Sequence, residues 1–414
     1  MNRVQVEIRD KKTTQRLTAA QSQDFNDAVE TLIRGGYART VEKCATRLRH
    51  YIPITPVFRD DKTTRCRQCT DARISNQFTI TGKIQSRKMA ECMLIFRLTS
   101  FVSTFDLRKA YWQVRLAPEE RGYCSTILGG RELIFNCLCF GTNYSSSMLE
   151  QAVRIVQALA NEQLYTNGPL IQGEPQRPTA GTLLTTNYVD DFSTRSRTRE
   201  HELTQNHWVR FSFAKYGLDS DKAFSNTDLV PSADWIPYLS HLWQPSSDKF
   251  RLETPKIKPH VGKMTLLQLV AIVAQLHDPL GLFMNVQLLG RSIIRDAFKC
   301  VNTRPLQPGE SGKNWNREID PQIIHKLNEW VAVLPSVEYL ALRRQNLNIL
   351  NVVVDASSTA WVFEIRDENF ALIFTKGGLI NERDTIPRGE LIALYEAKVG
   401  TLNLDLKELR TTSI

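Results

Sequence analysis

Apolar residues recur with helical spacing in several stretches of the chain, and each such stretch predicts an amphipathic helix. The first stretch, residues 18–38, stops at a Gly-Gly pair, which is a common helix end. The second begins near residue 145, where Ser147 and Glu150 fit a capping box. Its apolar stripe consists of Leu149, Val153, Val156 and Ala160. Two more helical patterns cover roughly 200–216 and 265–300.

Runs of β-branched and aromatic residues predict strands between the helices. Residues 51–76 are also basic and carry prolines that suit edge strands, so they predict a basic hairpin. Residues 101–116 begin as a strand and carry one acid, Asp106, just past the apolar part. Residues 130–142 predict a strand pair. Residues 183–196 predict a strand, a two-residue turn and a second strand.

The balance of 42% hydrophobic and 23% charged residues is that of a folded protein, and 414 residues suffice for two or three domains. The composition turns polar around 307–316, which we interpret as a boundary. Beyond it, residues 348–374 predict the strands of a separate α/β domain. The most apolar stretch, 266–283, is interrupted by polar residues and a proline, so it is not expected to span a bilayer. Scattered cysteines and the lack of a secretory signal predict a soluble, intracellular protein.

The net charge of +9 is concentrated at one end of the chain. Residues 1–100 contain 19 Lys and Arg against 10 Asp and Glu, which accounts for the whole excess. A local basic surface predicts a polyanionic partner, nucleic acid first and an anionic membrane second. A basic face that only aids solubility is the alternative that composition leaves open.

Asp106, Asp190 and Asp191 are the acids that most strongly indicate chemistry. If the strand that carries Asp106 shares a sheet with the hairpin of Asp190 and Asp191, all three can meet at one end of that sheet. Three close carboxylates repel one another unless cations neutralise them, and Mg²⁺ and Mn²⁺ prefer such oxygen ligands. Two such ions form the clamp used for in-line phosphoryl transfer. A solvated turn is the alternative for the Asp-Asp pair taken alone.

Four segments around these acids resemble, in order, the polymerase motifs of reverse transcriptases. FDLRKAYWQV (105–114) is similar to the first catalytic motif, and YVDD (188–191) to the second metal motif. Between them, LCFGTNYSSSMLEQAV (138–153) resembles the phenylalanine-glycine loop and helix of retroelement polymerases, although the proline usual after that loop is absent. YGLDSDKAF (216–224) resembles the later segment that carries a lysine.

Three further stretches resemble the BEL/Pao class of long-terminal-repeat retrotransposons. Residues 51–76 resemble its fingers segment, residues 238–252 the stretch beyond the palm, and residues 277–299 its Asp-Pro-Leu-Gly helix region. The resemblance implies an α+β right-hand polymerase with an antiparallel palm sheet, followed by a truncated ribonuclease H-like α/β domain. The implied division is 1–50 as a helical lead-in to the fingers, 51–228 as fingers and palm, 229–316 as thumb and connection, and 317–414 as the partial ribonuclease H-like domain.

The resemblance also implies roles for single residues. Asp106, Asp190 and Asp191 would hold two Mg²⁺ or Mn²⁺ ions, and Lys222 would give a proton to the leaving pyrophosphate. Tyr111 would be the steric gate that packs under the sugar and excludes a 2′-hydroxyl. A surface lysine and an ordinary core tyrosine are the alternatives for the last two residues.

Four more residues fall in segments that the resemblance assigns to nucleotide binding. Phe140 and Gly141 match the loop beside the incoming base and the primer terminus. Arg67 and Arg73 would lie in the fingers and bind the triphosphate, since a guanidinium fork suits phosphate oxygens. Two solvated arginines are the alternative.

The end of the chain resembles the ribonuclease H fold, in which a strand acid and a helix acid bind metal. Asp355 follows an apolar strand, and Glu390 stands near the start of an amphipathic helical pattern. By the family pattern the next strand carries a further Asp, and the chain stops at LKELRTTSI before such a strand could finish. We therefore expect Asp355 and Glu390 to be vestigial ligands and ribonuclease H activity to be absent.

Together these expectations describe an RNA-directed DNA polymerase from a retrotransposon pol polyprotein, which transfers a deoxynucleotide from dNTP to a primer 3′-hydroxyl. The expected partners are an RNA/DNA template–primer, dNTP and other parts of the polyprotein, with no membrane. The expected location is a cytoplasmic retroelement particle, with a nuclear stage left open. The alternative function is that of a catalytically inactive nucleic-acid-binding remnant of a retroelement.

Overall fold

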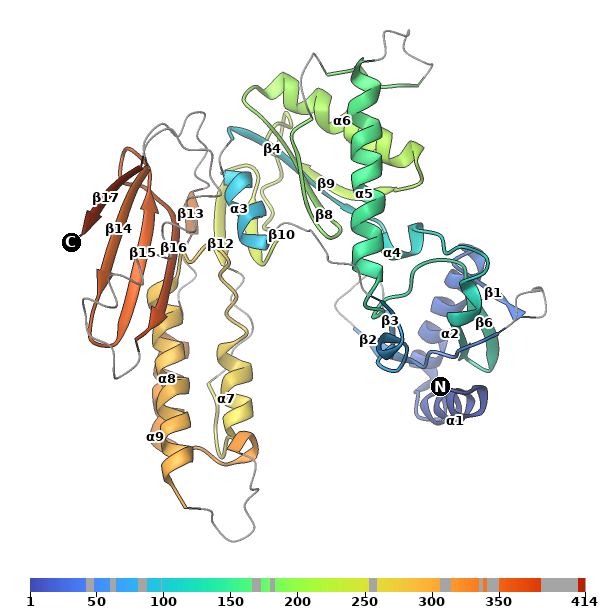
Figure 1. The fold of residues 1–414 in the computed structure, drawn as a ribbon, viewed down its shortest axis with the longest axis horizontal. Coiled ribbons are helices and arrows are strands. Elements are labelled where there is room, and N and C mark those ends of the chain that lie inside the picture. Colours follow the sequence, from blue (N-terminus) through green and yellow to red (C-terminus); the bar gives the residue numbers. More distant parts are fainter. Residues whose placement is uncertain are drawn as a thin grey trace. The chain divides into compact units, whose positions relative to one another are not determined.

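The protein is described here by a computed structural model (Figure 1), in which helices and mainly antiparallel sheets give the α+β class expected from the sequence. The structure describes residues 1–41, 48–59, 65–80, 88–97, 99–165, 173–178, 183–252, 259–305, 314–334, 338–340, 350–380 and 409–413. Within these ranges no helix has the length and apolar character needed to cross a membrane.

The chain forms two compact units, each assembled from separate stretches of sequence. The first unit consists of Met1–Arg87, Phe105–Thr194 and Leu203–Ala223. The second consists of Lys88–Thr104, Arg195–Glu202 and Phe224–Ile414. The expected domain limits at residues 50, 228 and 316 describe a finer division, which stays a prediction.

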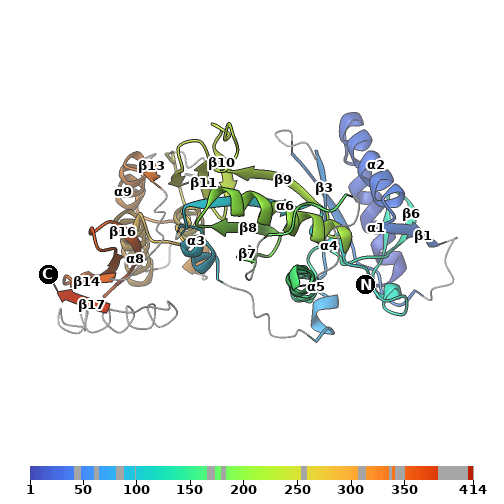
Figure 2. The same ribbon diagram turned by 90° about the horizontal axis from the view of Figure 1, so that it is seen from above.

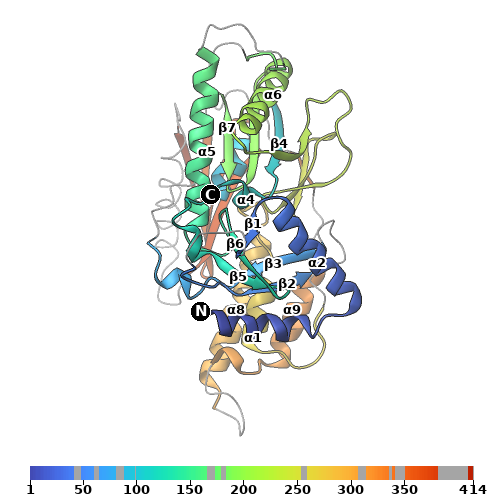
Figure 3. The same cartoon turned by 90° about the vertical axis from the view of Figure 1, so that its right-hand side faces the viewer.

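The N-terminal part of the first unit consists of helices and short strands (Figure 3); α2 and the strands share one apolar core, and Val6 of α1 packs in a smaller cluster with Tyr51 and Ile127. Its elements are α1 (Arg3–Thr14), α2 (Ala19–Arg34), β1 (Ala38–Thr40), β2 (Ile54–Phe58), β3 (Cys66–Thr70), β5 (Ser125–Leu128) and β6 (Arg131–Phe135). The expected helix and basic hairpin are α2 and the antiparallel pair β2–β3. The prediction of a strand pair within 130–142 was wrong in one respect, because β6 pairs with β5 and β1.

A four-stranded sheet with the order β7-β8-β4-β9 carries the predicted acids. Its strands are β4 (Phe101–Leu107), β7 (Thr185–Tyr188), β8 (Asp191–Ser196) and β9 (Ser220–Ser225), and the helices α5 (Ser145–Glu162) and α6 (Arg199–Lys215) accompany it (Figure 2). The expected apolar stripe of α5 is buried, and it joins residues of α6 and of the sheet in a single core. Both helices therefore cover the same face of the sheet.

The start of α5 differs from the sequence prediction. The expected capping box of Ser147 and Glu150 does not form, since the helix already begins at Ser145 and has no side-chain cap. Ser147 Oγ donates instead to the Tyr144 carbonyl at 2.8 Å. Glu150 is buried and accepts hydrogen bonds from Asn187 and Arg154. Glu150 therefore bonds α5 to β7 and does not cap the helix.

The second unit contains two sheets and a group of helices. Its elements are α3 (Met89–Arg97), β10 (Ile236–Tyr238), β11 (His241–Gln244), β12 (Lys249–Leu252), α7 (Leu266–Val273), α8 (Met284–Thr303), α9 (Pro321–Ala332), β13 (Glu338–Leu340), β14 (Leu350–Ala356), β15 (Ala360–Arg366), β16 (Leu372–Leu379) and β17 (Leu409–Ser413). The sheet orders are β10-β11-β12-β13 and β16-β15-β14-β17. The strands expected within 348–374 thus form a sheet, and β17 adds a strand parallel to β14.

Candidate active site

Asp106, Asp190 and Asp191 lie at one end of the β7-β8-β4-β9 sheet. The backbone N–H of Leu107, at the end of β4, donates to the Asp190 carbonyl at 3.0 Å. This bond ties the strand of Asp106 to the turn between β7 and β8. Three acids from two distant parts of the sequence are thereby brought together within the first unit.

Side-chain alternation along the strands decides which way these acids point. Phe105 and Leu107 of β4 and Phe192 of β8 lie in the core beneath α5 and α6, and the rings of Phe105 and Phe192 stack at 5.0 Å. Successive strand residues point to opposite faces, so Asp106 and Asp191 face away from the two helices. The apolar residues on one face of the sheet thus set the acids on its other face.

The turn between β7 and β8 is held in a strained backbone conformation. Tyr188 pairs with Asp191, so the two turn residues are Val189 and Asp190, and Asp191 is already the first residue of β8. Val189 has φ = 57°, a left-handed value that costs a β-branched residue about 1–2 kcal/mol. Because Val189 also packs against the core of the sheet, its side chain helps to hold this conformation.

The pKa values of the acids show that the carboxylates disfavour one another's charge. The pKa of Asp191 is raised to about 7, first by burial and then by the charges of Asp190 and Asp106. Burial also raises the pKa of Asp190. The pKa of Asp106 is raised by burial and by the charges of Asp221 and Asp190, whereas Lys222 lowers it. A cation placed among these carboxylates would offset both the cost of burying their charges and their mutual repulsion.

The donor chemistry of this cluster fits a hard divalent cation such as Mg²⁺ or Mn²⁺, because all of its ligands are carboxylate oxygens. Within the described residues, no three His, Cys, Asp or Glu side chains are placed close enough to ligate one ion. An ion bound by Asp106, Asp190 and Asp191 therefore requires their side chains to converge further.

Asp221 is a member of this electrostatic cluster that sequence reasoning missed. Its charge raises the pKa of Asp106, and its Oδ1 accepts the backbone N–H of Lys222 at 3.0 Å. Lys222 itself has φ = 39° and is exposed on β9. The signal was present in the sequence as the acid directly before the predicted lysine.

Tyr111 lies on α4 (Ala110–Gln113), the short helix that follows β4, and packs against the core beneath α5 and α6. Its ring meets the ring of Phe140 edge to face, with centroids 5.0 Å apart. Its hydroxyl lies 3.0 Å from Ser146 Oγ, the first-turn serine of α5. Phe140 remains 40% exposed, so this aromatic pair is accessible from solvent.

Gly141 allows the loop after Phe140 to approach the β2–β3 hairpin closely. It has φ = +84°, and a Cβ added there would lie 2.9 Å from the Thr70 carbonyl oxygen. Asn76 fixes the same loop from the other side, since its Nδ2 donates to the Gly141 carbonyl and its Oδ1 accepts the backbone N–H of Asn143. Glycine is therefore the residue that fits this position.

The two arginines assigned to triphosphate binding are placed differently. Arg73 makes two hydrogen bonds to Asp71, at 2.7 and 2.8 Å, and these strongly lower the pKa of the Asp71 carboxyl. Arg67 is exposed on β3, and among the described residues no hydrogen bond or ion pair holds its guanidinium. Of the two, Arg67 has the guanidinium available for a ligand.

Gln113, at the end of α4, joins the segment of Tyr111 to the segment before Lys222. Its Nε2 donates to the carbonyls of Arg108 and Asp219, and its Oε1 accepts the backbone N–H of Asp219. The Arg108 N–H also donates to the Asp219 carbonyl at 2.9 Å. Sequence reasoning did not single out this glutamine, because nothing local distinguishes it from a surface residue.

The ribonuclease H-like assignment rests on residues of the second unit. Asp355 lies on β14, exposed, with its Oδ1 accepting the backbone N–H of Ala356. Glu390 lies outside the described residues. The expectation for this pair stays a prediction.

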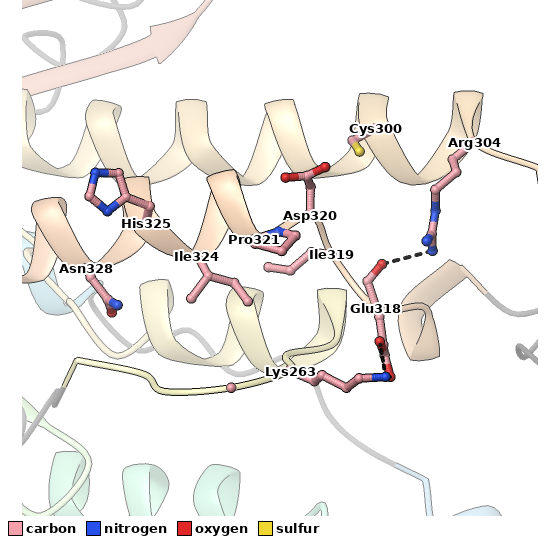
Figure 4. A pocket seen from close by; sticks show the side chains of 11 residues that line it. Lys263, Cys300, Arg304, Glu318, Ile319, Asp320, Pro321, Ile324, His325 and Asn328 are labelled. Carbon is pink, nitrogen blue, oxygen red and sulfur yellow. Dashed lines mark hydrogen bonds and ion pairs between the residues drawn. The ribbon is translucent and has the colours of Figure 1, made fainter. Parts of the chain in front are cut away.

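A cavity of about 650 Å³ in the second unit lies between the start of α9, the end of α8 and the segment before α7 (Figure 4). Lys263 forms an ion pair with Glu318 at its rim, and Arg304 donates to the Glu318 carbonyl. None of the predicted site residues lines it.

The described fold is similar to solved structures of foamy viral protease-reverse transcriptase. The TM-score is 0.67 against the dRH form in complex with double-stranded DNA, with 15% identity over 96% of this chain and 63% of that chain. It is 0.65 against the complex with an RNA/DNA hybrid, again at 15% identity over 96% of this chain, and 49% of that chain is covered. Against a further complex with double-stranded DNA it is 0.63, at 15% identity, over 96% of this chain and 75% of that chain.

Comparison by sequence gives no further relative, since no family model and no curated protein matches the chain. The chain spans about half to two thirds of the length of the first two viral chains. The structural likeness therefore shows the fold alone: this chain has a reverse transcriptase fold.

Proposed function

We propose that this chain is an RNA-directed DNA polymerase, derived from the pol polyprotein of a BEL/Pao-like retrotransposon. The observation that carries the proposal is the electrostatic coupling of Asp106, Asp190 and Asp191 at one sheet end, within a reverse transcriptase fold. The foamy viral neighbours are complexes with double-stranded DNA and with an RNA/DNA hybrid, which supports a template–primer as the partner.

In this proposal the three acids hold two Mg²⁺ or Mn²⁺ ions, which supply the charge neutralisation for in-line transfer of a nucleotidyl group. Asp106 and Asp191 face the nucleotide from the open side of the sheet, and the strained turn fixes Asp190 beside them. Lys222, near enough to lower the pKa of Asp106, holds the proton for the leaving pyrophosphate.

The remaining site residues bind and orient the nucleotide. Arg67 receives the triphosphate, while Arg73 braces Asp71 in the fingers. Phe140 and Gly141 line the base and the primer terminus, and Tyr111 lies under the sugar, where its ring excludes a 2′-hydroxyl. The edge-to-face contact of Tyr111 and Phe140 supports a common pocket for base and sugar.

Primer extension tests this function. The purified chain is given an RNA template, a DNA primer and dNTPs, in Mg²⁺ and then in Mn²⁺, beside the double variant Asp190→Asn, Asp191→Asn. Extension by the native chain that vanishes in the variant is the expected result. The variant controls for contaminating polymerase, since it keeps the side-chain volumes and removes only the charges.

A nucleic-acid-binding remnant without catalysis is the second candidate, and it is favoured by the absence of three converged ligands among the described residues. Salt-sensitive binding of the template–primer without extension in either metal would support it and contradict the polymerase.

We also propose that ribonuclease H activity is absent and that the chain acts in a cytoplasmic retroelement particle. Hydrolysis of the RNA strand of a hybrid by the native chain would contradict the first of these two statements.

A further inference from the structure

We propose that Ser146 is a positioning residue that fixes the Tyr111 ring and thereby sets the discrimination between deoxynucleotides and ribonucleotides. The inference rests on the proposed function, because it takes Tyr111 as the residue beneath the sugar. It concerns a serine in the segment after Phe140 and Gly141, from which the proline usual in the motif that it resembles is absent.

The three consecutive serines at the start of α5 use their hydroxyls differently. Ser145 Oγ donates to the Cys139 carbonyl at 2.8 Å, and Ser147 Oγ donates to the Tyr144 carbonyl at 2.8 Å. Both are the short-range bonds that helix-start serines commonly make. Ser146 Oγ instead lies 3.0 Å from the Tyr111 hydroxyl, 35 residues away in sequence. Of the three, only Ser146 has its described bond to another element.

The backbone around Ser146 is held firmly enough for such a bond to position its partner. The loop before it is bonded to Asn76 on two sides, through Gly141 and through Asn143. Ser145 and Ser147, its neighbours, are both buried. Ser146 therefore presents its hydroxyl from a fixed point, and the tyrosine is the partner that adjusts.

Tyr111 has two supports, one on its ring and one on its hydroxyl. The Phe140 ring meets it edge to face, but Phe140 is itself 40% exposed and so leaves the ring room to turn. The bond to Ser146 restrains the far end of the tyrosine. Without it, the ring can turn away from the sugar, and a 2′-hydroxyl then meets less obstruction.

The test compares kcat/KM for dATP and for ATP in single-nucleotide incorporation by the full chain. We expect Ser146→Ala to lower the dATP:ATP ratio of kcat/KM by roughly three- to tenfold, the effect of losing one hydrogen bond between partly buried groups. Ser146→Thr, which keeps the hydroxyl, returns the ratio to within about twofold of the native value. Ser147→Ala is the matched control, because it removes a hydroxyl one residue away and leaves the ratio unchanged.

The tyrosine side of the bond gives an independent check. Tyr111→Phe keeps the ring and removes the same bond, so it lowers the ratio to the same extent, and the double variant with Ser146→Ala lowers it no further. A native ratio in Ser146→Ala, or multiplied effects in the double variant, would overturn the proposal.

Failure of the proposed function gives a different pattern. In that case the native chain incorporates neither nucleotide, or Tyr111→Ala leaves the ratio unchanged although incorporation proceeds. The first result removes the polymerase and the second removes the gate role of Tyr111. If Tyr111→Ala lowers the dATP:ATP ratio but Ser146→Ala keeps the native ratio, only the proposed role of Ser146 is contradicted.

Discussion

Asp191 contributes a carboxylate to the proposed metal site, and its burial lowers the stability of the metal-free chain at high pH. Its pKa of about 7 in the folded chain is well above the value of about 3.9 for an unfolded Asp, so the folded chain holds this proton at pH values where the unfolded chain has released it. In the absence of divalent cations, the stability that this group contributes is therefore fully present below about pH 4 and is lost as pH rises through 7.

Asp191→Asn should remove that pH dependence. In EDTA at pH 8, we expect the variant to be more stable than the native chain by on the order of 2 kcal/mol, while primer extension is lost. Urea unfolding at pH 5 and pH 8 measures the difference, with Asp234→Asn, an exposed acid, as the control. Equal free energies of unfolding for the native chain and Asp191→Asn at pH 8 would show that the charged Asp191 carboxylate does not destabilise the fold.

Gly141 permits a second prediction at the scale of one residue. In Gly141→Ala the added Cβ is strained by the left-handed backbone and also clashes with the Thr70 carbonyl oxygen. Gly217→Ala, at φ = +80°, has the same backbone strain, but no atom lies within 4 Å of the added Cβ. We expect Gly217→Ala to lower the free energy of unfolding by about 1 kcal/mol and Gly141→Ala by about 1–3 kcal/mol more. Chemical denaturation of both variants measures the two effects, and equal losses would mean that the hairpin gives way to the added methyl group.

The site residues differ in how far the sequence could predict them. Asp106, Asp190 and Asp191 could be singled out because close carboxylates need a physical reason, and the sheet end supplies their meeting point. Arg73 could not be distinguished from Arg67, since only the fold brings Asp71 into bidentate contact with one of them. Ser146 was one of three equal serines in the sequence, and only its direction in the folded chain separates it from the others.

At the scale of elements, Gln113 couples two parts of the site. It bonds the end of α4 to Asp219, three residues before Lys222, so the Tyr111 segment and the lysine segment are held in one arrangement. We expect Gln113→Ala to lower kcat of primer extension roughly tenfold, because misplaced catalytic groups lose effective concentration. Gln151→Ala on the exposed side of α5 is the control. A native kcat in Gln113→Ala would show that the backbone bond from Arg108 to Asp219 suffices alone.

Helices and strands could be predicted where the hydrophobic pattern is long. The predictions were wrong where contacts between distant parts of the chain determine the local structure. The stripe of α5 and the hairpin β7–β8 follow directly from periods of 3.6 and 2 in the sequence. The capping box at Ser147 does not form because α5 begins two residues earlier, and Glu150 instead accepts a hydrogen bond from Asn187, on a strand that no sequence signal links to α5. The partner strands of β6 were likewise set by residues far away in the chain.

At the scale of the whole molecule, the two units carry opposite dependences on pH. His241 of the second unit is buried beside Asp278, with Arg97 and His277 also acting on it, and burial first of all lowers its pKa to about 4. Because the unfolded pKa is about 6.5, this group takes up a proton on unfolding, and its contribution to stability is lost as pH falls from 6.5 through 4. Burial raises the pKa of Asp278, which acts in the opposite direction and moderates this loss.

We therefore expect the metal-free chain to unfold in a different order at the two ends of the pH range. At pH 4.5 the β10–β12 strands around His241 should lose protection from hydrogen exchange first, and in EDTA at pH 8 the β7–β8 hairpin should lose it first. Mg²⁺ at pH 8 should restore the hairpin alone, since a ligand of the folded state stabilises only the unit that binds it. His241→Gln should flatten the acid-side loss and leave the alkaline side unchanged. Hydrogen exchange with mass spectrometry, corrected for the intrinsic exchange rate at each pH, measures protection of both segments in one experiment. If both segments lose protection together at both pH values, the two units unfold as one.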